Sequence, residues 1–287
     1  MLFKNITILD ENFEIKENMY VGTEGSRITY IGTESPAPIS MGGKDFGEIY
    51  DGKGKLLMPA FYNSHGHSPM ALMRGYGENM ALQDWLNKLI FPFEDKLDSN
   101  AVYWGTTLTM AESMRFGIVS TTDMYYFIDD MVRATDDAGM KANISRAIVN
   151  FDDSDVWQLP SMQEMKRTFE AYHNMNDERI KMDVSIHGEY TSNHLAVEAV
   201  TAFGRERGAN MHIHISETRS EHEECKGRHN GMTPVQYFNS LGAWDMPATA
   251  AHCVWIEGED FDILKEKGVT VATNPVSNLK LASGVCN

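Results

Sequence analysis

A repeated order of strand and helix from residue 56 onward is the feature that most constrains the fold of this chain. Apolar strand candidates recur along the sequence, and helical stretches lie between them. Such units in succession require parallel strands joined by right-handed crossovers. The seven predicted strands are 56–63, 118–123, 141–148, 180–187, 210–216, 248–253 and 269–273. The fold class is therefore α/β. A closed (β/α)8 barrel, or TIM barrel, is the natural completion, and its eighth strand is absent from the pattern.

Residue types that cap helices mark the ends of three of the predicted helices. The helix 100–116 starts after Asp98 and Ser99 and stops at Gly117. The helices 195–207 and 260–267 each end at a glycine. Glycine is favoured there because it takes the left-handed conformation that terminates a helix.

The first 57 residues follow another pattern. Short β-rich runs at 3–9, 19–21, 27–31 and 48–50 are separated by Gly, Asn, Asp, Ser and Pro, which predicts a small antiparallel sheet. The chain is therefore divided into a small β portion, residues 1–57, and a barrel portion, residues 58–287.

Charge and cysteine content exclude several classes of protein. The net charge is 25 − 41 = −16, with no basic block, so a nucleic-acid backbone or an anionic membrane surface is not an expected partner. No apolar run suggests a signal peptide or a spanning helix. Three cysteines without C-x-x-C spacing fit reduced thiols. These features predict a soluble, acidic protein of the cytoplasm.

Histidines gather where the predicted strands end, which is where a barrel carries its catalytic groups. The first strand leads into His65 and His67, and residues two apart on a strand point to the same side. These two imidazoles can bind one ion, and Gly66 keeps the intervening position free of bulk. Taken alone, the pair could equally be polar residues on a solvated loop.

The fifth strand repeats this spacing with His212 and His214. Only His214 lies near the C-terminal end of the strand, so it is predicted as a third ligand, and His212 as a packed or hydrogen-bonded residue. Glu217 lies just past the strand end, within reach of a molecule bound at the metal. His252 and His187 end the sixth and fourth strands. Several such coincidences at one predicted mouth favour a functional site.

These residue types define a chemistry. Imidazoles suit Zn²⁺ or Fe²⁺, and zinc lowers the pKa of a bound water to about 7. Glu217 can move a proton, and His252 can orient the water by hydrogen bonding. Three neutral histidines leave the ion doubly charged, so an anionic ligand is also expected. Asp123 ends the second strand and could be this anionic ligand. It is more simply interpreted as a polar loop residue that supports the metal ligands from outside.

The motifs at these positions resemble those of the amidohydrolase superfamily, and within it the methylthioadenosine/S-adenosylhomocysteine deaminase group. The likeness runs nearly from end to end. It is carried by the segments Met58-Pro59-Ala60-Phe61-Tyr62-Asn63-Ser64-His65-Gly66-His67, Met73-Arg74-Gly75-Tyr76, Phe91-Pro92-Phe93-Glu94, His212-Ile213-His214-Ile215-Ser216-Glu217-Thr218, Ala251-His252-Cys253-Val254 and Asn274-Pro275-Val276-Ser277-Asn278.

The resemblance implies a TIM barrel of the metal-dependent hydrolase type with a small β-sandwich portion, and it implies roles for individual residues. His65, His67 and His214 would hold one divalent ion, Zn²⁺ before Fe²⁺. Glu217 would be the proton shuttle and His252 would position the water. The expected substrate contacts are Trp85, Glu94, Arg146, His187 and Glu217, with Glu94 on ribose hydroxyls and Arg146 on a substrate carboxylate.

Plainer interpretations stand beside three of these roles. Trp85 lies in a helical pattern of apolar residues and could be core. Glu94 could be a solvated loop acid, and Arg146 could pair with a surface carboxylate. The acidic run 217–224, apart from Glu217, is interpreted as the solvated face of a helix.

The expected activity is hydrolytic deamination of adenosine, methylthioadenosine or S-adenosylhomocysteine, with release of ammonia. The chain would thus be a hydrolase of carbon–nitrogen bonds in cyclic amidines, with a small-molecule substrate. A homo-oligomer is left open. The alternatives are a deaminase or hydrolase of a cytosine, guanine, pterin or triazine type of heterocycle, or an inactive truncated barrel.

Two departures from the family pattern bear on these expectations. Where the group often has His-x-Pro-Tyr, this chain has His187-Gly188-Glu189-Tyr190, which predicts an added carboxylate near the site. The family's metal-binding aspartate belongs to the eighth strand, and the sequence stops at Asn287 before it. The 287-residue chain is therefore expected to be incomplete and, as it stands, inactive.

Overall fold

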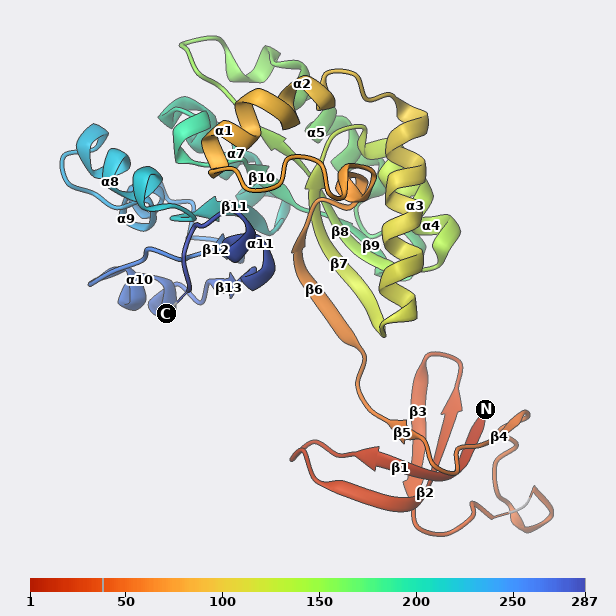
Figure 1. Ribbon diagram of the computed structural model, residues 1–287. Helices are drawn as coiled ribbons and strands as arrows, with labels where there is room; N and C mark the ends of the chain where they lie inside the picture. The colour runs from red at the N-terminus through yellow and green to blue at the C-terminus, as the bar shows by residue number, and fades with distance from the viewer. Residues whose placement is uncertain (38, 287) are drawn as a thin grey trace. The chain divides into compact units, whose positions relative to one another are not determined.

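The computed structural model describes residues 1–37 and 39–286 (Figure 1). Contacts within the chain divide it into two compact units, Met1–Ala60 and Phe61–Asn287. Each unit has its own cluster of buried apolar side chains. None of the helices in the described ranges has the length and apolar character that a membrane span requires.

The first unit is a mixed β-sheet. Its strands are β1 (Leu2–Leu9), β2 (Ile15–Glu24), β3 (Arg27–Gly32), β4 (Ile49–Asp51) and β5 (Leu56–Leu57), with one short helix, η1 (Ile39–Met41). β1 pairs with β2 in antiparallel fashion but with β4 and β5 in parallel fashion. The prediction of an antiparallel sheet is therefore wrong for this part. The long connection after β3 returns the chain across the sheet, so β4 can run in the direction of β1.

Alternation of side chains gives this sheet its buried face. Ile6 and Ile8 on β1 pack with Met19 and Val21 on β2, and each pair is two residues apart. Side chains at that spacing point to the same face of a sheet. Leu57, on β5, packs against the same cluster.

The second unit is a barrel of parallel strands, as predicted. Its strands are β6 (Phe61–Gly66), β7 (Ile118–Tyr125), β8 (Lys141–Ile148), β9 (Ile180–Met182), β10 (Val184–Ile186), β11 (Met211–Ile215), β12 (Ala248–His252) and β13 (Thr270–Ala272). Their order is β13-β12-β11-β10-β8-β7-β6, and β9 pairs with β8 below β10. β9 and β10 thus share one position, which makes seven positions. In the ranges that the structure describes, no strand joins β13 to β6.

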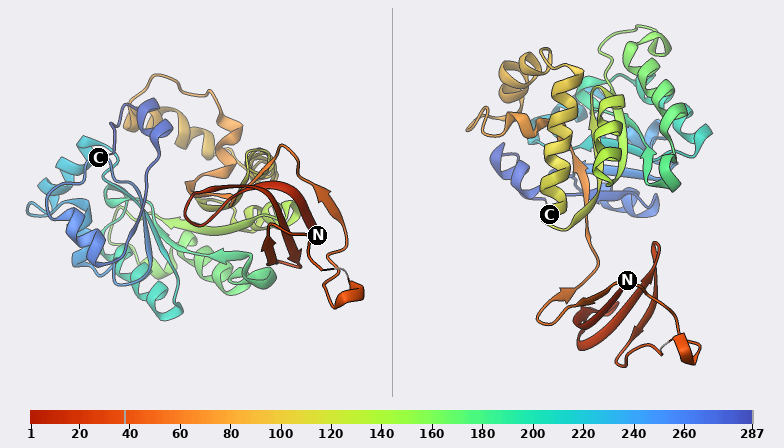
Figure 2. Two further views of the ribbon diagram at one scale, coloured as in Figure 1. Left: turned by 90° about the horizontal axis from the view of Figure 1, so that it is seen from below. Right: turned by 90° about the vertical axis from the view of Figure 1, so that its right-hand side faces the viewer.

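Helices lie outside these strands (Figures 1 and 2). They are α3 (Ser99–Arg115), α4 (Ile128–Ala138), α5 (Pro160–Tyr172), α6 (Met175–Glu178), α7 (His194–Arg207), α8 (Arg219–Arg228), α9 (Pro234–Ser240), α10 (Asp260–Glu266) and α11 (Pro275–Lys280), with short turns η4 (Val156–Gln158) and η5 (Glu189–Thr191). The predicted capping residues have their expected roles. Asp98 accepts a hydrogen bond from the backbone N–H of Ala101, and Gly208 ends α7 in the left-handed conformation.

The first barrel strand lies later in the sequence than predicted. The predicted strand 56–63 is divided, because Leu56 and Leu57 pair with β1 in the small sheet and β6 starts only at Phe61. Pro59 lies in the gap between them. Proline has no backbone N–H to donate to a neighbouring strand, so it separates the two short strands.

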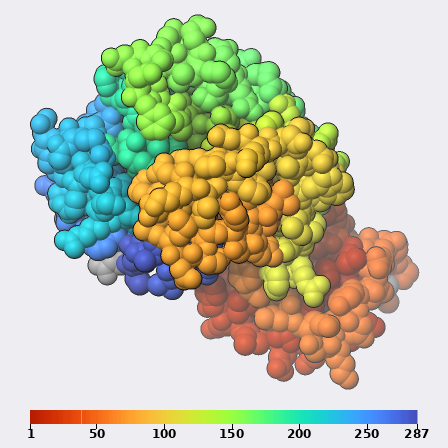
Figure 3. All heavy atoms as spheres, turned by 45° about the horizontal axis from the view of Figure 1, so that its top comes forward, coloured from red at the N-terminus to blue at the C-terminus, as the bar shows by residue number. Residues whose placement is uncertain are grey.

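The long connection between β6 and α3 folds into four short helices. They are η2 (Ser68–Met73), α1 (Leu82–Trp85), η3 (Leu86–Ile90) and α2 (Phe91–Glu94). Leu82, Leu86 and Ile90 are buried in the main core, so this segment is packed against the barrel. In Figure 3 it is coloured orange to yellow and lies on the face turned toward the viewer.

Gly105 allows η2 to pack closely against α3, and its substitution gives a stability prediction. A Cβ atom at Gly105 would lie 2.7 Å from the backbone oxygen of Pro69. Gly105→Ala is therefore expected to lower the free energy of unfolding by about 1–3 kcal/mol, although alanine is the better helix former. Urea unfolding followed by circular dichroism measures the change.

Gly227 in α8 is the matched control, because a Cβ atom there would meet nothing within 4 Å. Gly227→Ala is expected to stabilise the fold by about 0.5–1 kcal/mol. A gain in stability for both variants would contradict the close approach of η2.

Candidate metal centre and substrate pocket

Histidines from β6, β11 and β12 meet at the C-terminal ends of these strands. One ring nitrogen of each of His65, His214 and His252 lies within 4.8 Å of the other two, and all three residues are buried. His67 directly follows β6, and its Nε2 atom lies 3.2 Å from Nε2 of His214. The structure therefore brings the three predicted ligands and His252 into one cluster.

Backbone carbonyls determine which nitrogen carries the hydrogen in two of these rings. Nδ1 of His67 lies 2.7 Å from the oxygen of Met124, and Nδ1 of His214 lies 2.7 Å from that of His187. A carbonyl oxygen can only accept, so each Nδ1 donates and each Nε2 keeps its lone pair. The two Nε2 atoms therefore face each other as acceptors, with no hydrogen between them.

This arrangement fits a metal ion. Burial lowers the pKa of both the His67 and the His214 ring, which keeps them neutral and prevents a proton from relieving the repulsion. Zinc–nitrogen bonds of about 2.0–2.1 Å at tetrahedral angles place two ligand nitrogens about 3.3 Å apart. The observed separation of 3.2 Å matches that value.

A buried histidine holds the ring of His65, the third predicted ligand, in place. Nδ1 of His65 lies 2.8 Å from Nε2 of His212, which is fully buried. When His65 donates from Nδ1, its own Nε2 atom is available to an ion. The interpretation of His212 as a hydrogen-bonded residue is confirmed. A contact of this kind is the one by which outer partners orient metal-bound imidazoles in proteins.

Glu217 and His252 combine an acid with a neutral hydrogen-bond acceptor. Burial raises the pKa of the Glu217 carboxyl to about 7, and an oxygen of Glu217 lies 3.6 Å from Nδ1 of His252. Nδ1 of His252 donates to the side-chain oxygen of Asn278 at 2.8 Å, so its Nε2 atom can accept. Burial lowers the pKa of His252 to about 4. Glu217 can therefore gain or lose a proton near neutral pH beside an uncharged imidazole.

The cluster opens into a cavity of about 250 Å³. The four residues predicted only as substrate contacts, Trp85, Glu94, Arg146 and His187, all line it. A second cavity of about 800 Å³ shares Glu94, Arg146 and His187 with the first. The pocket beside the histidines therefore continues into a wider outer space.

Two charged residues lie in the wall that the cavities share. Burial raises the pKa of the Glu94 carboxyl, and the hydroxyl groups of Tyr125 and Tyr126 oppose this rise. Arg146 donates from Nε to Glu164 at 2.9 Å, and its guanidinium lies 4.6 Å from the centre of the Tyr126 ring. Arg146 thus lies at the pocket and also has a carboxylate partner.

Comparison with known proteins identifies the family. The family model described as "Amidohydrolase family" matches residues 56–287, which is most of the chain. The chain belongs to the amidohydrolase family. It is 37% identical over 286 residues to a 5-methylthioadenosine/S-adenosylhomocysteine deaminase of Thermoanaerobacter pseudethanolicus. It is 38% identical over 271 residues to a 5'-deoxyadenosine deaminase of Methanococcus maripaludis.

These alignments cover nearly all of the chain but only part of each relative. They include 99% and 94% of this chain and 64% and 63% of the two relatives. The chain therefore spans just under two thirds of the length of the curated relatives that it matches.

Solved structures share the fold of this amidohydrolase. An adenosine deaminase from Xanthomonas campestris with bound zinc superposes with a TM-score of 0.83 at 23% identity, over 99% of this chain and 64% of the other. A guanine deaminase from C. acetobutylicum with bound guanine superposes with a TM-score of 0.86 at 18% identity, over 99% and 69%. Family membership and the histidine cluster together support a site for a divalent metal ion.

Asp123 of the amidohydrolase lies on β7 opposite Gly66 of β6 and is not among the clustered residues. Its carboxylate accepts hydrogen bonds from the backbone N–H of Ser68 at 3.1 Å and from the Ser68 hydroxyl. It therefore stabilises the start of η2, directly after His67. In the described part of the chain, no carboxylate joins the His65, His214 and His252 group at ligand distance.

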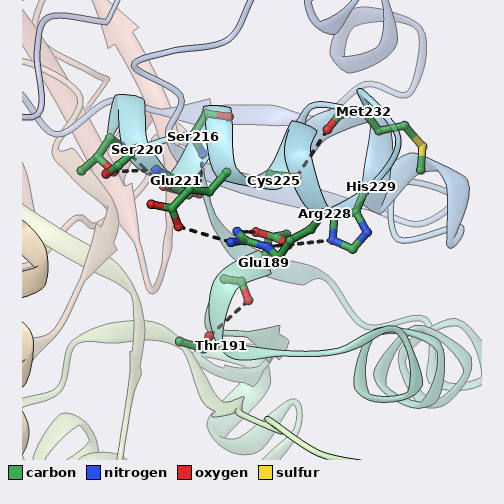
Figure 4. A network of polar contacts seen from close by, with 12 residues as sticks. Glu189, Thr191, Ser216, Ser220, Glu221, Cys225, Arg228, His229 and Met232 are labelled. Carbon is green, nitrogen blue, oxygen red and sulfur yellow. Dashed lines mark hydrogen bonds and ion pairs between the residues drawn. The ribbon is translucent and has the colours of Figure 1, made fainter.

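Glu189 and Glu221 lie where the sequence interpretation did not place them. Glu189 is absent from the cavity lining and instead binds Arg228 at 2.5 and 3.0 Å and His229 at 2.7 Å (Figure 4). It therefore adds no charge to the pocket. Glu221 is only 3% exposed and His222 only 2%, so the interpretation of residues 218–224 as a solvated face is wrong for these two residues. The spacing of Thr218 and Glu221 is that of a capping box, a signal that could have revealed the role of Glu221.

Proposed function

We propose that this amidohydrolase catalyses the hydrolytic deamination of adenine nucleosides and their 5'-thioether derivatives. The names of its relatives, methylthioadenosine/S-adenosylhomocysteine deaminase and 5'-deoxyadenosine deaminase, support this substrate class. The observation that carries the proposal is the pair of facing Nε2 lone pairs of His67 and His214, with the buried Glu217 at the same end of the cavity.

The ion in this proposal is Zn²⁺, held by His65, His67 and His214. Neutral imidazoles are good ligands for zinc, and the bonds from Nδ1 to Met124 and His187 aim two of the three lone pairs at one point. When bound, a zinc ion supplies Lewis acidity, which lowers the pKa of a water molecule enough for attack at neutral pH.

Residues of the chain move the proton and orient the water. Glu217, with a pKa of about 7, accepts a proton from the attacking water and gives it to the heterocycle. His252 accepts a hydrogen bond from the same water at Nε2, because its Nδ1 is occupied by Asn278. In the balanced reaction, the oxygen of water adds to the amino-bearing ring carbon, one of its protons reaches a ring nitrogen through Glu217, and the other reaches the amino group. The carbon–nitrogen bond then breaks, and ammonia leaves.

The lining of the pocket gives each part of a nucleoside a partner. Trp85 and Glu94 line the pocket, and we assign Trp85 to the base and Glu94 to the ribose hydroxyls. His187 donates from Nδ1 to the hydroxyl of Thr191 at 3.1 Å, so its Nε2 atom can accept from the substrate. Arg146 borders the outer cavity, where a 5' substituent would extend.

Substitution of Arg146 is expected to lower the activity on one proposed substrate much more than the activity on another. Arg146→Ala should lower kcat/KM for S-adenosylhomocysteine about tenfold to a hundredfold, because a hydrogen bond between charged groups is lost. Adenosine has no carboxylate and should be affected much less. Steady-state kinetics with both substrates measures the difference.

Arg167→Ala is the matched control, because Arg167 pairs with Asp129 away from both cavities. This substitution also removes one positive charge. It is expected to leave the ratio of kcat/KM for S-adenosylhomocysteine to kcat/KM for adenosine unchanged. Equal losses on adenosine and S-adenosylhomocysteine in Arg146→Ala would contradict the proposed contact.

Ammonia release by the full-length, zinc-loaded protein tests the proposed function itself. Adenosine, methylthioadenosine, S-adenosylhomocysteine and 5'-deoxyadenosine are assayed beside guanine and cytosine. Turnover of at least one adenine nucleoside is expected. If the protein turns over guanine or cytosine but none of the adenine nucleosides, the proposed substrate class is wrong.

The proposal also includes a cellular location and a type of partner. We propose the cytoplasm, where the buried thiols of Cys225 and Cys253 would stay reduced. The proposed partner is the small-molecule substrate, and neither a nucleic acid nor a membrane is proposed as a partner.

A further inference from the structure

A second buried carboxylate, that of Glu221, holds the turn that carries Glu217. Three successive backbone N–H groups donate to it: Ser216 to Oε1 at 2.9 Å, Glu217 to Oε2 at 2.8 Å and Thr218 to Oε2 at 3.4 Å. The turn links the end of β11 to the start of α8. One side chain in the first turn of α8 therefore binds the whole connection between the strand and the helix.

These contacts extend beyond ordinary helix capping. In a capping box, the carboxylate at the third helical position binds the backbone N–H of the N-cap residue, here Thr218. Glu221 also binds the two residues before that N-cap, Ser216 and Glu217. Capping of α8 does not need these two bonds, so they need another explanation.

The backbone conformation of the turn shows why it needs support. Ser216 has φ of +47°, in the left-handed region that non-glycine residues adopt at a cost. Its carbonyl oxygen accepts from the N–H groups of Val254 and Trp255 at 3.1 and 3.0 Å, which ties the turn to the end of β12. The Glu221 carboxylate satisfies the N–H groups that this unusual conformation turns inward.

The side chain of Glu217 has little else to direct it. In the described ranges its carboxylate makes no hydrogen bond, and the nearest polar ring is that of the neutral His252, whose Nδ1 atom lies 3.6 Å away. Its position at the pocket therefore depends on the backbone of residues 216–218. A rotation of that backbone would move the carboxylate away from His252 and the clustered imidazoles.

We propose that Glu221 is a positioning residue that aims Glu217 at the reacting atoms. The inference rests on the proposed function, because it takes Glu217 as the group that moves the proton. Glu221 itself does not line the cavity and does not touch the substrate. Its carboxylate sets the path of the backbone, and the backbone sets the direction of the Glu217 side chain.

A double-mutant cycle tests this inference in the full-length, zinc-loaded protein. Glu221→Gln keeps the size of the side chain but replaces one acceptor oxygen by an NH₂ group that faces other N–H donors. It is expected to lower kcat tenfold to a hundredfold, with KM changed less than twofold and zinc retained. In the Glu217→Gln background, the same substitution should lower kcat less than twofold further, because no shuttle remains to be aimed.

Glu223→Gln in the same helix is the matched control, because Glu223 is exposed and its carboxylate forms an ion pair only with Lys226, at 3.5 Å, among the described residues. It should leave kcat unchanged in both backgrounds. Equal losses for Glu221→Gln in the presence and absence of Glu217 would overturn the inference, since a merely structural role acts independently of the shuttle. No loss in the single variant would overturn it as well.

Amide hydrogen exchange gives a readout that does not depend on activity. Glu221→Gln should speed exchange at residues 216–218 and leave the barrel strands unchanged, and Glu223→Gln should do neither. If the unsubstituted protein deaminates none of the substrates, the proposed function fails. Amide hydrogen exchange then still tests whether Glu221 holds the backbone of residues 216–218. Unchanged exchange at 216–218 would overturn its positioning role.

Discussion

Replacement of His214 by alanine is expected to abolish tight zinc binding and deaminase activity together. His214 supplies one of two Nε2 lone pairs that lie 3.2 Å apart, and the bond from its Nδ1 to the carbonyl of His187 holds the ring in that direction. His65→Ala is expected to have the same effect, because His65 belongs to the same cluster. With one of three imidazoles removed, an open tetrahedral site loses both its affinity and its geometry.

Metal analysis after dialysis, together with ammonia release, measures both effects on one sample. His194→Ala is the control, because His194 is an exposed residue at the start of α7. It should keep stoichiometric zinc and normal turnover. Stoichiometric zinc and near-normal activity in either His65→Ala or His214→Ala would refute the ligand assignment.

Glu217→Gln is expected to retain zinc and to lose most turnover. The amide cannot carry a proton from the water to the heterocycle, and a general acid–base group contributes about 10²–10⁴-fold to the rate. Burial raises the pKa of Glu217 to about 7, so its carboxylate form is lost as the pH falls through that value. A bound cation would move this point lower. The wild-type rate should therefore fall on the acid side of neutrality.

The pH profile of kcat gives the decisive comparison for Glu217. The acid limb should be present in the wild type and absent from Glu217→Gln, because the amide does not titrate. A loss of less than about tenfold in kcat would show that another group moves the proton. An unchanged acid limb in the variant would assign that limb to a different residue.

Much of the barrel can be predicted because its signals are local. The strand β8 was predicted with its observed bounds, and the helices α3 and α7 differ from prediction by one residue at their ends. Asp98 caps the start of α3 and Gly208 ends α7, so each residue determines a helix end within one turn of its own position. The start of β6 could not be predicted from local signals, because residues 56–63 form one apolar run. Its first two residues pair with β1 in the small sheet, and its residues from Phe61 onward pair with β7 in the barrel.

The clustering of the site residues was also predictable, for a topological reason. Parallel strands end at one edge, so His65, His214 and His252 meet there, although they lie far apart in the sequence. The capping-box spacing of Thr218 and Glu221 could have shown that Glu221 binds the start of α8, but the contacts of Glu221 with residues 216 and 217 and the ion pair of Glu189 were not predictable. Glu189 and Glu221 have the same side chain, and only the packing of η5 and α8 directs one to Arg228 and the other to the Glu217 turn.

The carbonyl oxygens of Met124 and His187 have a consequence for how the sequence of this amidohydrolase can change. Because they are backbone atoms, no side-chain replacement at either position deletes the acceptor that orients His67 or His214. The residues that line the pocket from the segment 82–94 belong to other elements and can vary separately. Under the proposed function, substitutions in that segment are expected to change substrate choice while the orientation of His67 and His214 is kept, which makes this barrel a suitable starting point for redesign toward new heterocycles.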